Sequence, residues 1–256
     1  MGAHLTFAEE TMIKRILAAI GLGSATVASA ADKELVGPYK DHSTNLIYHL
    51  LFCDRLKLFE DNHQGELNDP WAILFKTVPD YEAVAKIAND KGQESRVRML
   101  AFGLLRSAKK VVPQKELLGT IIEVRMPGGL DTLAVFTDGG ARYINHSGKI
   151  AVVEGVPSPF QKEIDDVIKA SRPIVAAIGP WDKDRLPAPG KGNIRMTFLV
   201  SDGLYFGEGP MDVMQQEQMA APLIQSATTL LLKLVERTTN SEPDGGGQPA
   251  TRPESK

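Results

Sequence analysis

Short runs of alternating apolar and polar residues, each ended by a glycine-rich turn, dominate the middle of the chain. Over residues 119–126, the apolar Ile122 and Val124 fall on one side of an extended segment. Glu123 and Arg125 fall between them and therefore face the opposite side. This alternation indicates a strand with one apolar face, a pattern that a helix cannot produce.

Three further runs repeat the pattern, and each is reached through a turn that contains glycine. Such spacing is typical of an antiparallel meander. The predicted strands cover residues 119–126, 130–137, 141–145 and 149–154, with turns at 127–129, 138–140 and 146–148.

A second hairpin is predicted later in the chain, where Ser201-Asp202-Gly203 separates residues 193–200 from residues 204–206. Residues 207–210, Gly-Glu-Gly-Pro, are expected to end that hairpin, since glycine and proline are poor strand formers. The sheet should therefore have about six strands.

Helical periodicity governs the first part of the chain. The clearest helix spans residues 93–109, and further helices are expected after the caps Ser43 or Thr44 and Asp80. A helix starting near Ser158 and a last one ending near Arg237 follow the strands. The predicted class is α+β: a helical N-terminal part, then an antiparallel sheet with helices packed on one face.

The chain divides into three segments by composition. Residues 1–30 are predicted to be a signal peptide, and residues 240–256 a disordered tail rich in turn formers. Residues 31–239 are expected to form a single α+β domain, mainly helical over 31–115 and with sheet plus helices over 116–239.

The leader carries the compartment prediction. Lys14 and Arg15 precede a short apolar run that ends in Ala28-Ser29-Ala30, as in a secretory signal. Glu9 and Glu10 do not fit such a leader, and a translation start at Met12 would remove them. We therefore expect a periplasmic or secreted protein.

The alternative compartment is the cytoplasm, with the same segment forming a helical extension. The lone cysteine, Cys53, weighs toward this alternative, because exported proteins commonly pair their cysteines.

Composition excludes several classes of partner and cofactor. The formal net charge is −3, and no basic run is interleaved with aromatic residues, so nucleic acid is not an expected partner. The apolar run of the leader is shorter than the ~20 residues of a membrane span. His42 and His49 are too far apart on one helix to share an ion, so neither a metal nor another cofactor is predicted.

Candidate binding residues lie in two turns of the predicted sheet. Asn145, His146 and Ser147 share a sheet end with the turn at 127–129, and Asp131 or Asp138 could complete a Ser-His-Asp arrangement. Asn and Ser are also what turns select, and the turn-forming interpretation is favoured.

The second group comprises Asp202, Tyr205 and Glu208, in or next to the later hairpin. These residues either form a binding edge or stabilise the hairpin, and the stabilising role is favoured.

The function expected from the sequence is a non-enzymatic protein-interaction domain, exported as an inhibitor, an immunity-type protein or an accessory factor. Its partner is expected to be another protein. The alternative is a small-molecule hydrolase or ligand-binding enzyme with a site at the sheet end near Asn145–Ser147.

Overall fold

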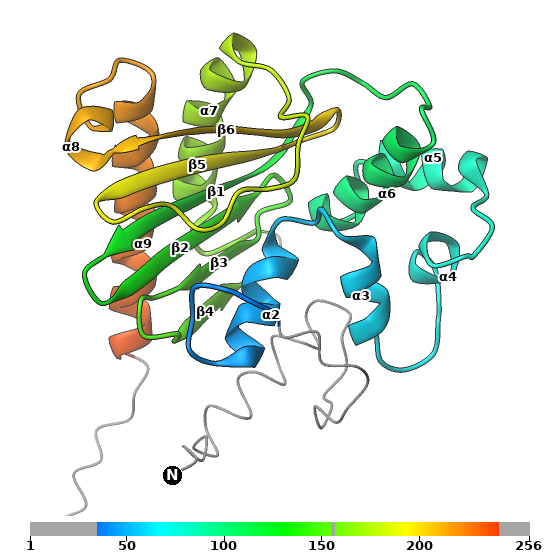
Figure 1. Ribbon diagram of the computed structural model, residues 1–256, viewed down its shortest axis with the longest axis horizontal. Helices are drawn as coiled ribbons and strands as arrows, with labels where there is room; N and C mark the ends of the chain where they lie inside the picture. Colours follow the sequence, from blue (N-terminus) through cyan, green and yellow to red (C-terminus); the bar gives the residue numbers. More distant parts are fainter. Residues whose placement is uncertain (1–34, 155–156, 241–256) are drawn as a thin grey trace, which may run out of the picture.

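A computed structural model describes residues 35–154 and 157–240, and its centre is one six-stranded antiparallel sheet (Figure 1). The order of the strands across the sheet is β4-β3-β2-β1-β5-β6. The strands are β1 (Leu117–Met126), β2 (Gly129–Phe136), β3 (Ala141–Ile144), β4 (Ile150–Val153), β5 (Asn193–Val200) and β6 (Gly203–Pro210).

Eight helices accompany the sheet in the described residues. Five precede it: α2 (His42–Leu51), α3 (Leu56–Asn62), α4 (Trp71–Leu74), α5 (Tyr81–Asn89) and α6 (Ser95–Ser107). The others are α7 (Gln161–Ala177), α8 (Met211–Met214) and α9 (Ala220–Asn240). The α+β class, with a helical first part and six strands, is confirmed.

Alternation along β1 divides the interior into two cores, one on each face of the sheet. Ile122 packs with α7 and α9, whereas Ile121 belongs to the core formed with the helices α2–α6. The predicted packing of helices on one face thus describes α7 and α9, and the helical first part covers the opposite face (Figure 1).

Residues 207–210 correct one prediction. They do not end the hairpin but extend β6 to Pro210, with Glu208 opposite Arg195 in the register with β5. Because β6 is an edge strand, one of its sides needs no partner, so glycines and a terminal proline are tolerated there. The extension places the Glu208 carboxylate on the face that α2 covers.

Two helix starts follow the predicted capping chemistry, one of them at a shifted residue, whereas α7 has Phe160 and not Ser158 at its N-cap. Asp80 caps α5 by accepting a hydrogen bond from the Ala83 N–H at 3.1 Å. Asp41, rather than Ser43 or Thr44, caps α2 and accepts from the Thr44 N–H at 2.8 Å. Asp41 is preferred because its carboxylate accepts more strongly than a hydroxyl.

The predicted signal peptide and most of the predicted tail lie outside the described residues. Among the helices that are described, none combines the length and apolar content needed to cross a bilayer.

Candidate functional site

The turn from β3 to β4 holds Asn145, His146 and Ser147 at the surface, and Asn145 organises it. The Asn145 Oδ1 accepts hydrogen bonds from the backbone N–H groups of Ser147 and Lys149, both at 2.9 Å. It also accepts from the Ser147 hydroxyl at 2.8 Å. These contacts are those of an asparagine that stabilises a turn.

His146 is held to the neighbouring strand β2 and not to Ser147. Its backbone N–H donates to Asp131 Oδ1 at 2.6 Å, and its Nδ1 lies 3.4 Å from the same oxygen. The side chain is 52% exposed. Since the Ser147 hydroxyl bonds to Asn145, this turn supplies no serine–histidine pair, and the hydrolase alternative gains no support from it.

The turns of β1–β2 and β3–β4 do lie together at one end of the sheet. A Cβ atom placed on Gly129 would come within 2.4 Å of the His146 carbonyl oxygen. Any residue other than glycine would therefore clash at this position. The two turns are therefore in close backbone contact.

Asp202 and Tyr205 lie at the opposite end of the sheet, in and beside the β5–β6 turn. The Tyr205 hydroxyl donates to Asp202 Oδ2 at 2.9 Å, and its side chain is buried against α7 and α9. Burial, with the Asp202 hydrogen bond, raises the Tyr205 pKa to about 12. This pair ties the turn to the core.

Glu208 alone among the predicted site residues joins a larger charged cluster. We call Glu208 on β6, Arg195 on β5 and Glu123 on β1 the ionic row, because strand pairing sets them side by side across three neighbouring strands. The Arg195 Nε and Nη2 donate to Glu208 Oε2 at 2.8 and 2.6 Å. Asn193 donates to the other Glu208 oxygen at 3.0 Å.

Glu123 is the buried member of the ionic row. It is fully inaccessible to solvent, and its Oε1 accepts a hydrogen bond from the Tyr48 hydroxyl at 2.7 Å. Its Oε2 lies 4.0 Å from Arg195 Nη1 and has no hydrogen-bond partner within the described residues. A buried carboxylate oxygen without a partner is uncommon in folded proteins.

A long irregular loop covers the ionic row on the side of α2. We call residues 181–192, between α7 and β5, the strap; it passes in front of the sheet in Figure 1. Arg195 Nη1 donates to two strap carbonyls, those of Leu186 at 3.3 Å and Pro187 at 2.6 Å. The buried arginine thus holds the strap and Glu208 together.

Arg185 fixes the strap to α2 through its side chain. Its Nε donates to Asp54 Oδ2 at 2.8 Å, and its Nη2 lies 2.9 Å from His49 Nδ1. The guanidinium carbon is 3.8 Å from the centre of the Phe52 ring and 5.7 Å from that of Tyr48. Only 8% of the Arg185 side chain is exposed. We call Tyr48, His49, Phe52 and Asp54 the socket.

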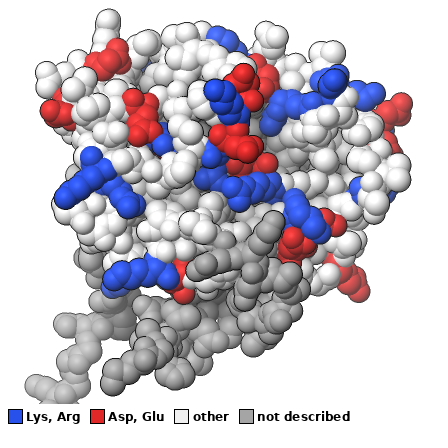
Figure 2. All heavy atoms as spheres, in the orientation of Figure 1, with Lys and Arg blue, Asp and Glu red and all other residues white. Residues whose placement is uncertain are grey.

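Charges of both signs lie close together around this region, and Figure 2 shows acidic and basic side chains interleaved near the centre of the visible face. Burial raises the pKa of Glu123 above that of an ordinary glutamate, although Tyr48 and Arg195 oppose the shift. Burial lowers the pKa of His49, and the charges of Arg185 and Arg55 add to that effect. Perturbed groups gathered in one place mark a candidate functional site.

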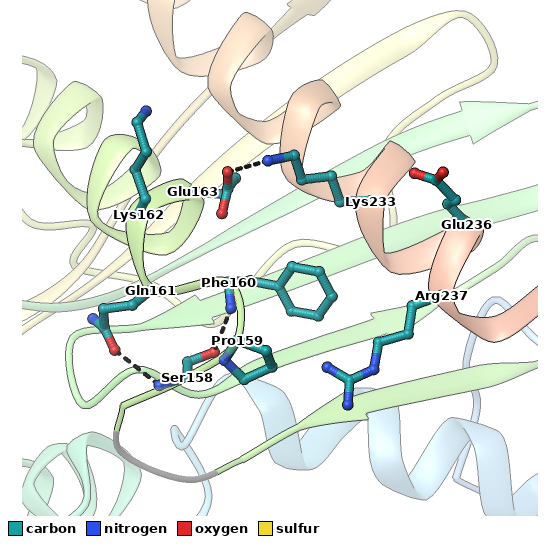
Figure 3. Close-up of a pocket in the computed structure, with 9 residues that line it drawn as sticks. All are labelled: Ser158, Pro159, Phe160, Gln161, Lys162, Glu163, Lys233, Glu236 and Arg237. Carbon is teal, nitrogen blue, oxygen red and sulfur yellow. Dashed lines mark hydrogen bonds and ion pairs between the residues drawn. The ribbon is translucent and has the colours of Figure 1, made fainter. Parts of the chain in front are cut away.

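A surface hollow of about 700 Å³ lies elsewhere, between the start of α7 and the end of α9 (Figure 3). Glu163 pairs with Lys233 inside it, and the Arg237 guanidinium lies 5.6 Å from the Phe160 ring centre. A smaller hollow of about 330 Å³, between α5 and α6, is lined by Tyr81, Phe102 and other residues. Neither contains a residue of the ionic row, the strap or the socket.

No set of three or more His, Cys, Asp or Glu side chains in the described part of the chain is arranged to hold a metal ion. Cys53, which follows α2, is buried, and burial raises the pKa of its thiol.

Comparison with known proteins adds no family and no relative: no family model, no curated protein and no solved structure matches the chain.

Sequence analysis identified Glu208 but missed its partners in the row and the socket. The available signal was a charged residue within an otherwise strand-forming segment, Glu123 in β1 and Arg195 in β5. Alternation assigns such residues to a solvated face. The helices of the first part cover that face, and this cannot be seen from the strands alone.

Proposed function

We propose that this protein is a non-enzymatic protein-interaction domain that works after export, as an inhibitor, an immunity-type protein or an accessory factor. The observation that carries the proposal is the way in which Arg185 is held between the Phe52 ring and the Asp54 carboxylate. An arginine stacked on an aromatic ring and paired with a carboxylate is typical of the centre of protein interfaces.

The strap is attached in a way that another chain could reproduce. Its N-terminal end is fixed by the Trp181 N–H, which donates to the Leu204 carbonyl at 2.7 Å. Further along, Arg185 and Arg195 hold it through their side chains, and at its C-terminal end the Gly192 carbonyl accepts from the Met211 N–H at 3.0 Å. Since no continuous strand ladder holds the strap, a partner offering similar groups can take its place.

Displacement of the strap would uncover a charged surface that is suited to recognition. Arg195 and Glu208 would face the partner with Glu123 beside them. Charged groups held rigidly on neighbouring strands select partners of complementary charge and reject others. We therefore place the interaction surface at the ionic row and the socket.

Export is supported by the leader sequence, in which small residues at Ala28 and Ala30 follow a short apolar run. We expect the mature chain to begin at Ala31, and N-terminal sequencing of protein from its native host tests this. Ala30→Phe should block processing. Recovery of an intact chain beginning at Met1 in the cytosol would contradict export.

The interaction is tested by affinity purification of the C-terminally tagged full gene product from the periplasm of its native host. We expect the wild type to retain one protein in stoichiometric amount, which is then purified and titrated. Glu208→Gln should weaken its binding at least about tenfold, as expected for loss of a buried charge contact. Lys169→Ala, on α7, is the matched control and should leave it unchanged. Recovery of the wild type without a partner would contradict the proposal.

A further inference from the structure

We propose that the socket is a guanidinium-binding site. In the free protein Arg185 of the same chain occupies it, and in the complex an arginine side chain of the partner replaces Arg185. The identity of this second occupant rests on the proposed function. The selectivity of the socket for guanidinium does not, because it follows from the geometry of the socket itself.

Each wall of the socket matches one property of a guanidinium group. The Phe52 ring, at 3.8 Å from the Arg185 guanidinium carbon, presents a flat surface to a flat cation. The Asp54 carboxylate accepts the in-plane Nε–H at 2.8 Å. A lysine ammonium is compact and not planar. It therefore cannot stack on the Phe52 ring and at the same time reach the acceptors on Asp54 and His49.

His49 adds a second acceptor in the plane of the guanidinium. Its Nε2 lies 2.9 Å from the Val36 carbonyl, which can only accept, so the proton is assigned to Nε2. The Nδ1 lone pair therefore faces Arg185 Nη2 at 2.9 Å. A neutral histidine with this tautomer selects a donor at that position.

The socket belongs to α2 and to the turn that follows it, so it does not depend on the strap for its shape. Phe52 is fully buried and contacts Tyr48 edge to face, with ring centres 5.3 Å apart. Cys53 adopts a left-handed backbone conformation, with φ of 50°, and turns the chain so that Asp54 follows beside the ring. The socket should remain formed when Arg185 leaves.

The strap keeps the socket filled in the free protein. Hydrogen bonds fix both ends of the strap, so Arg185 is held beside the socket at an effective concentration far above the millimolar value of a short flexible tether. A free guanidinium compound competes poorly against it, whereas a protein partner adds contacts along the ionic row. Removing the Arg185 side chain should therefore expose a binding activity that the wild type hides.

The test is thermal unfolding of the full chain with Arg185→Ala in the presence of methylguanidinium. We expect the melting temperature to rise with methylguanidinium concentration as binding to the folded state with a Kd of about 1 mM requires, that is, logarithmically above the Kd; such a Kd is reasonable for so small a ligand. Methylammonium, which has the charge without the plane, and urea, which has the plane without the charge, should give no such rise.

Two variants serve as controls for the site. Arg172→Ala, which removes an exposed arginine of α7, should respond like the wild type, with no such rise over the same concentrations. Asp54→Asn in the Arg185→Ala background should weaken methylguanidinium binding at least about tenfold, since it removes the charged acceptor. An equal response in all variants, or none in Arg185→Ala, would overturn the proposal.

Arg185→Gln is a second probe for the case in which Arg185→Ala does not fold. If neither variant folds, Arg185 is an integral part of the core and the proposal is wrong. Failure of the proposed function gives a different result: methylguanidinium binds to the Arg185→Ala variant, but the wild type is recovered without a partner. The two failures are thus distinguishable.

Discussion

The two faces of the sheet are built by different means. The face toward α7 and α9 is closed mainly by apolar side chains, such as Leu223 and Leu230 of α9 against Phe198 of β5. The face toward α2 buries an ionic row as well as an apolar core. Apolar packing is non-directional and tolerant, whereas buried charges are stable only with specific partners. Stability should therefore respond to pH through the α2 face.

The largest expected effect is that of Arg195→Leu on the α2 face. The change leaves the Glu208 and Glu123 carboxylates without the cation between them, and breaking a buried ion pair in this way costs ~3–5 kcal/mol. Urea unfolding at pH 7.5 measures the loss. Arg125→Leu, on the same face but near the end of β1, is the control and should change stability far less. A loss below ~1 kcal/mol would show that the ionic row is not a structural unit.

On the opposite face, Leu230→Ala should cost ~2–5 kcal/mol, because it leaves a cavity beneath α9 where the side chain is fully buried. Leu232→Ala removes the same atoms from an exposed position of the same helix and should have little effect. The loss at Leu230 should be equal at pH 5 and pH 7.5. A loss that changes with pH would contradict the expectation that only the α2 face makes stability depend on pH.

Glu123→Gln should have a smaller effect, and one that depends on pH. Because burial raises the folded pKa of Glu123, the folded state binds the proton more tightly than the unfolded state does. The stability of the wild type therefore falls as pH rises from the unfolded pKa through the folded pKa. Glutamine carries no charge at any pH and avoids this loss.

The free energy of unfolding of Glu123→Gln, relative to that of the wild type, should therefore be higher at pH 7.5 than at pH 4. Urea unfolding at both pH values checks the sign. If the relative free energy of unfolding of the variant is instead lower at pH 7.5, the charged carboxylate stabilises the folded state.

The smallest effect should be local, at the contact of the strap with His49. Burial lowers the folded pKa of His49, so the stability that the neutral ring provides is present above the unfolded pKa of ~6.5 and is lost as pH falls through the folded pKa. Protonation places a hydrogen on Nδ1, facing the Arg185 donor. Hydrogen exchange in residues 181–192, corrected for the intrinsic rate, should accelerate on acidification.

His49→Asn keeps a polar group that does not titrate and should remove this pH dependence. His146→Asn, at an exposed position, should leave it unchanged. Acceleration that persists in His49→Asn would assign the effect to another group.

The sequence predicted the elements well wherever the signal was local. The range 193–200 coincides with β5, and residues 93–109 contain α6. Glycine turns and apolar periodicity act over a few residues, so one segment carries the whole signal. The prediction for residues 207–210 was wrong because the position of β6 at the sheet edge is a property of the whole sheet.

The candidate site was mostly beyond local signals. Glu123 and Arg195 become neighbours only through the register of β1 with β5, and Tyr48 meets Glu123 only because α2 covers that face. Glu208 was predicted either to stabilise the later hairpin or to form a binding edge, without its partner Arg195. Charge pairs between distant segments depend on topology, and the alternating pattern alone does not specify topology.

The burial of Cys53 has a consequence for redox chemistry. Thiol oxidation and disulfide exchange proceed through an accessible thiolate, and this thiol is enclosed in the core with its pKa raised. The chain should therefore resist dimerisation through a disulfide under oxidising conditions and react with thiol reagents only after unfolding. A single unpaired cysteine of this kind is chemically compatible with an exported protein.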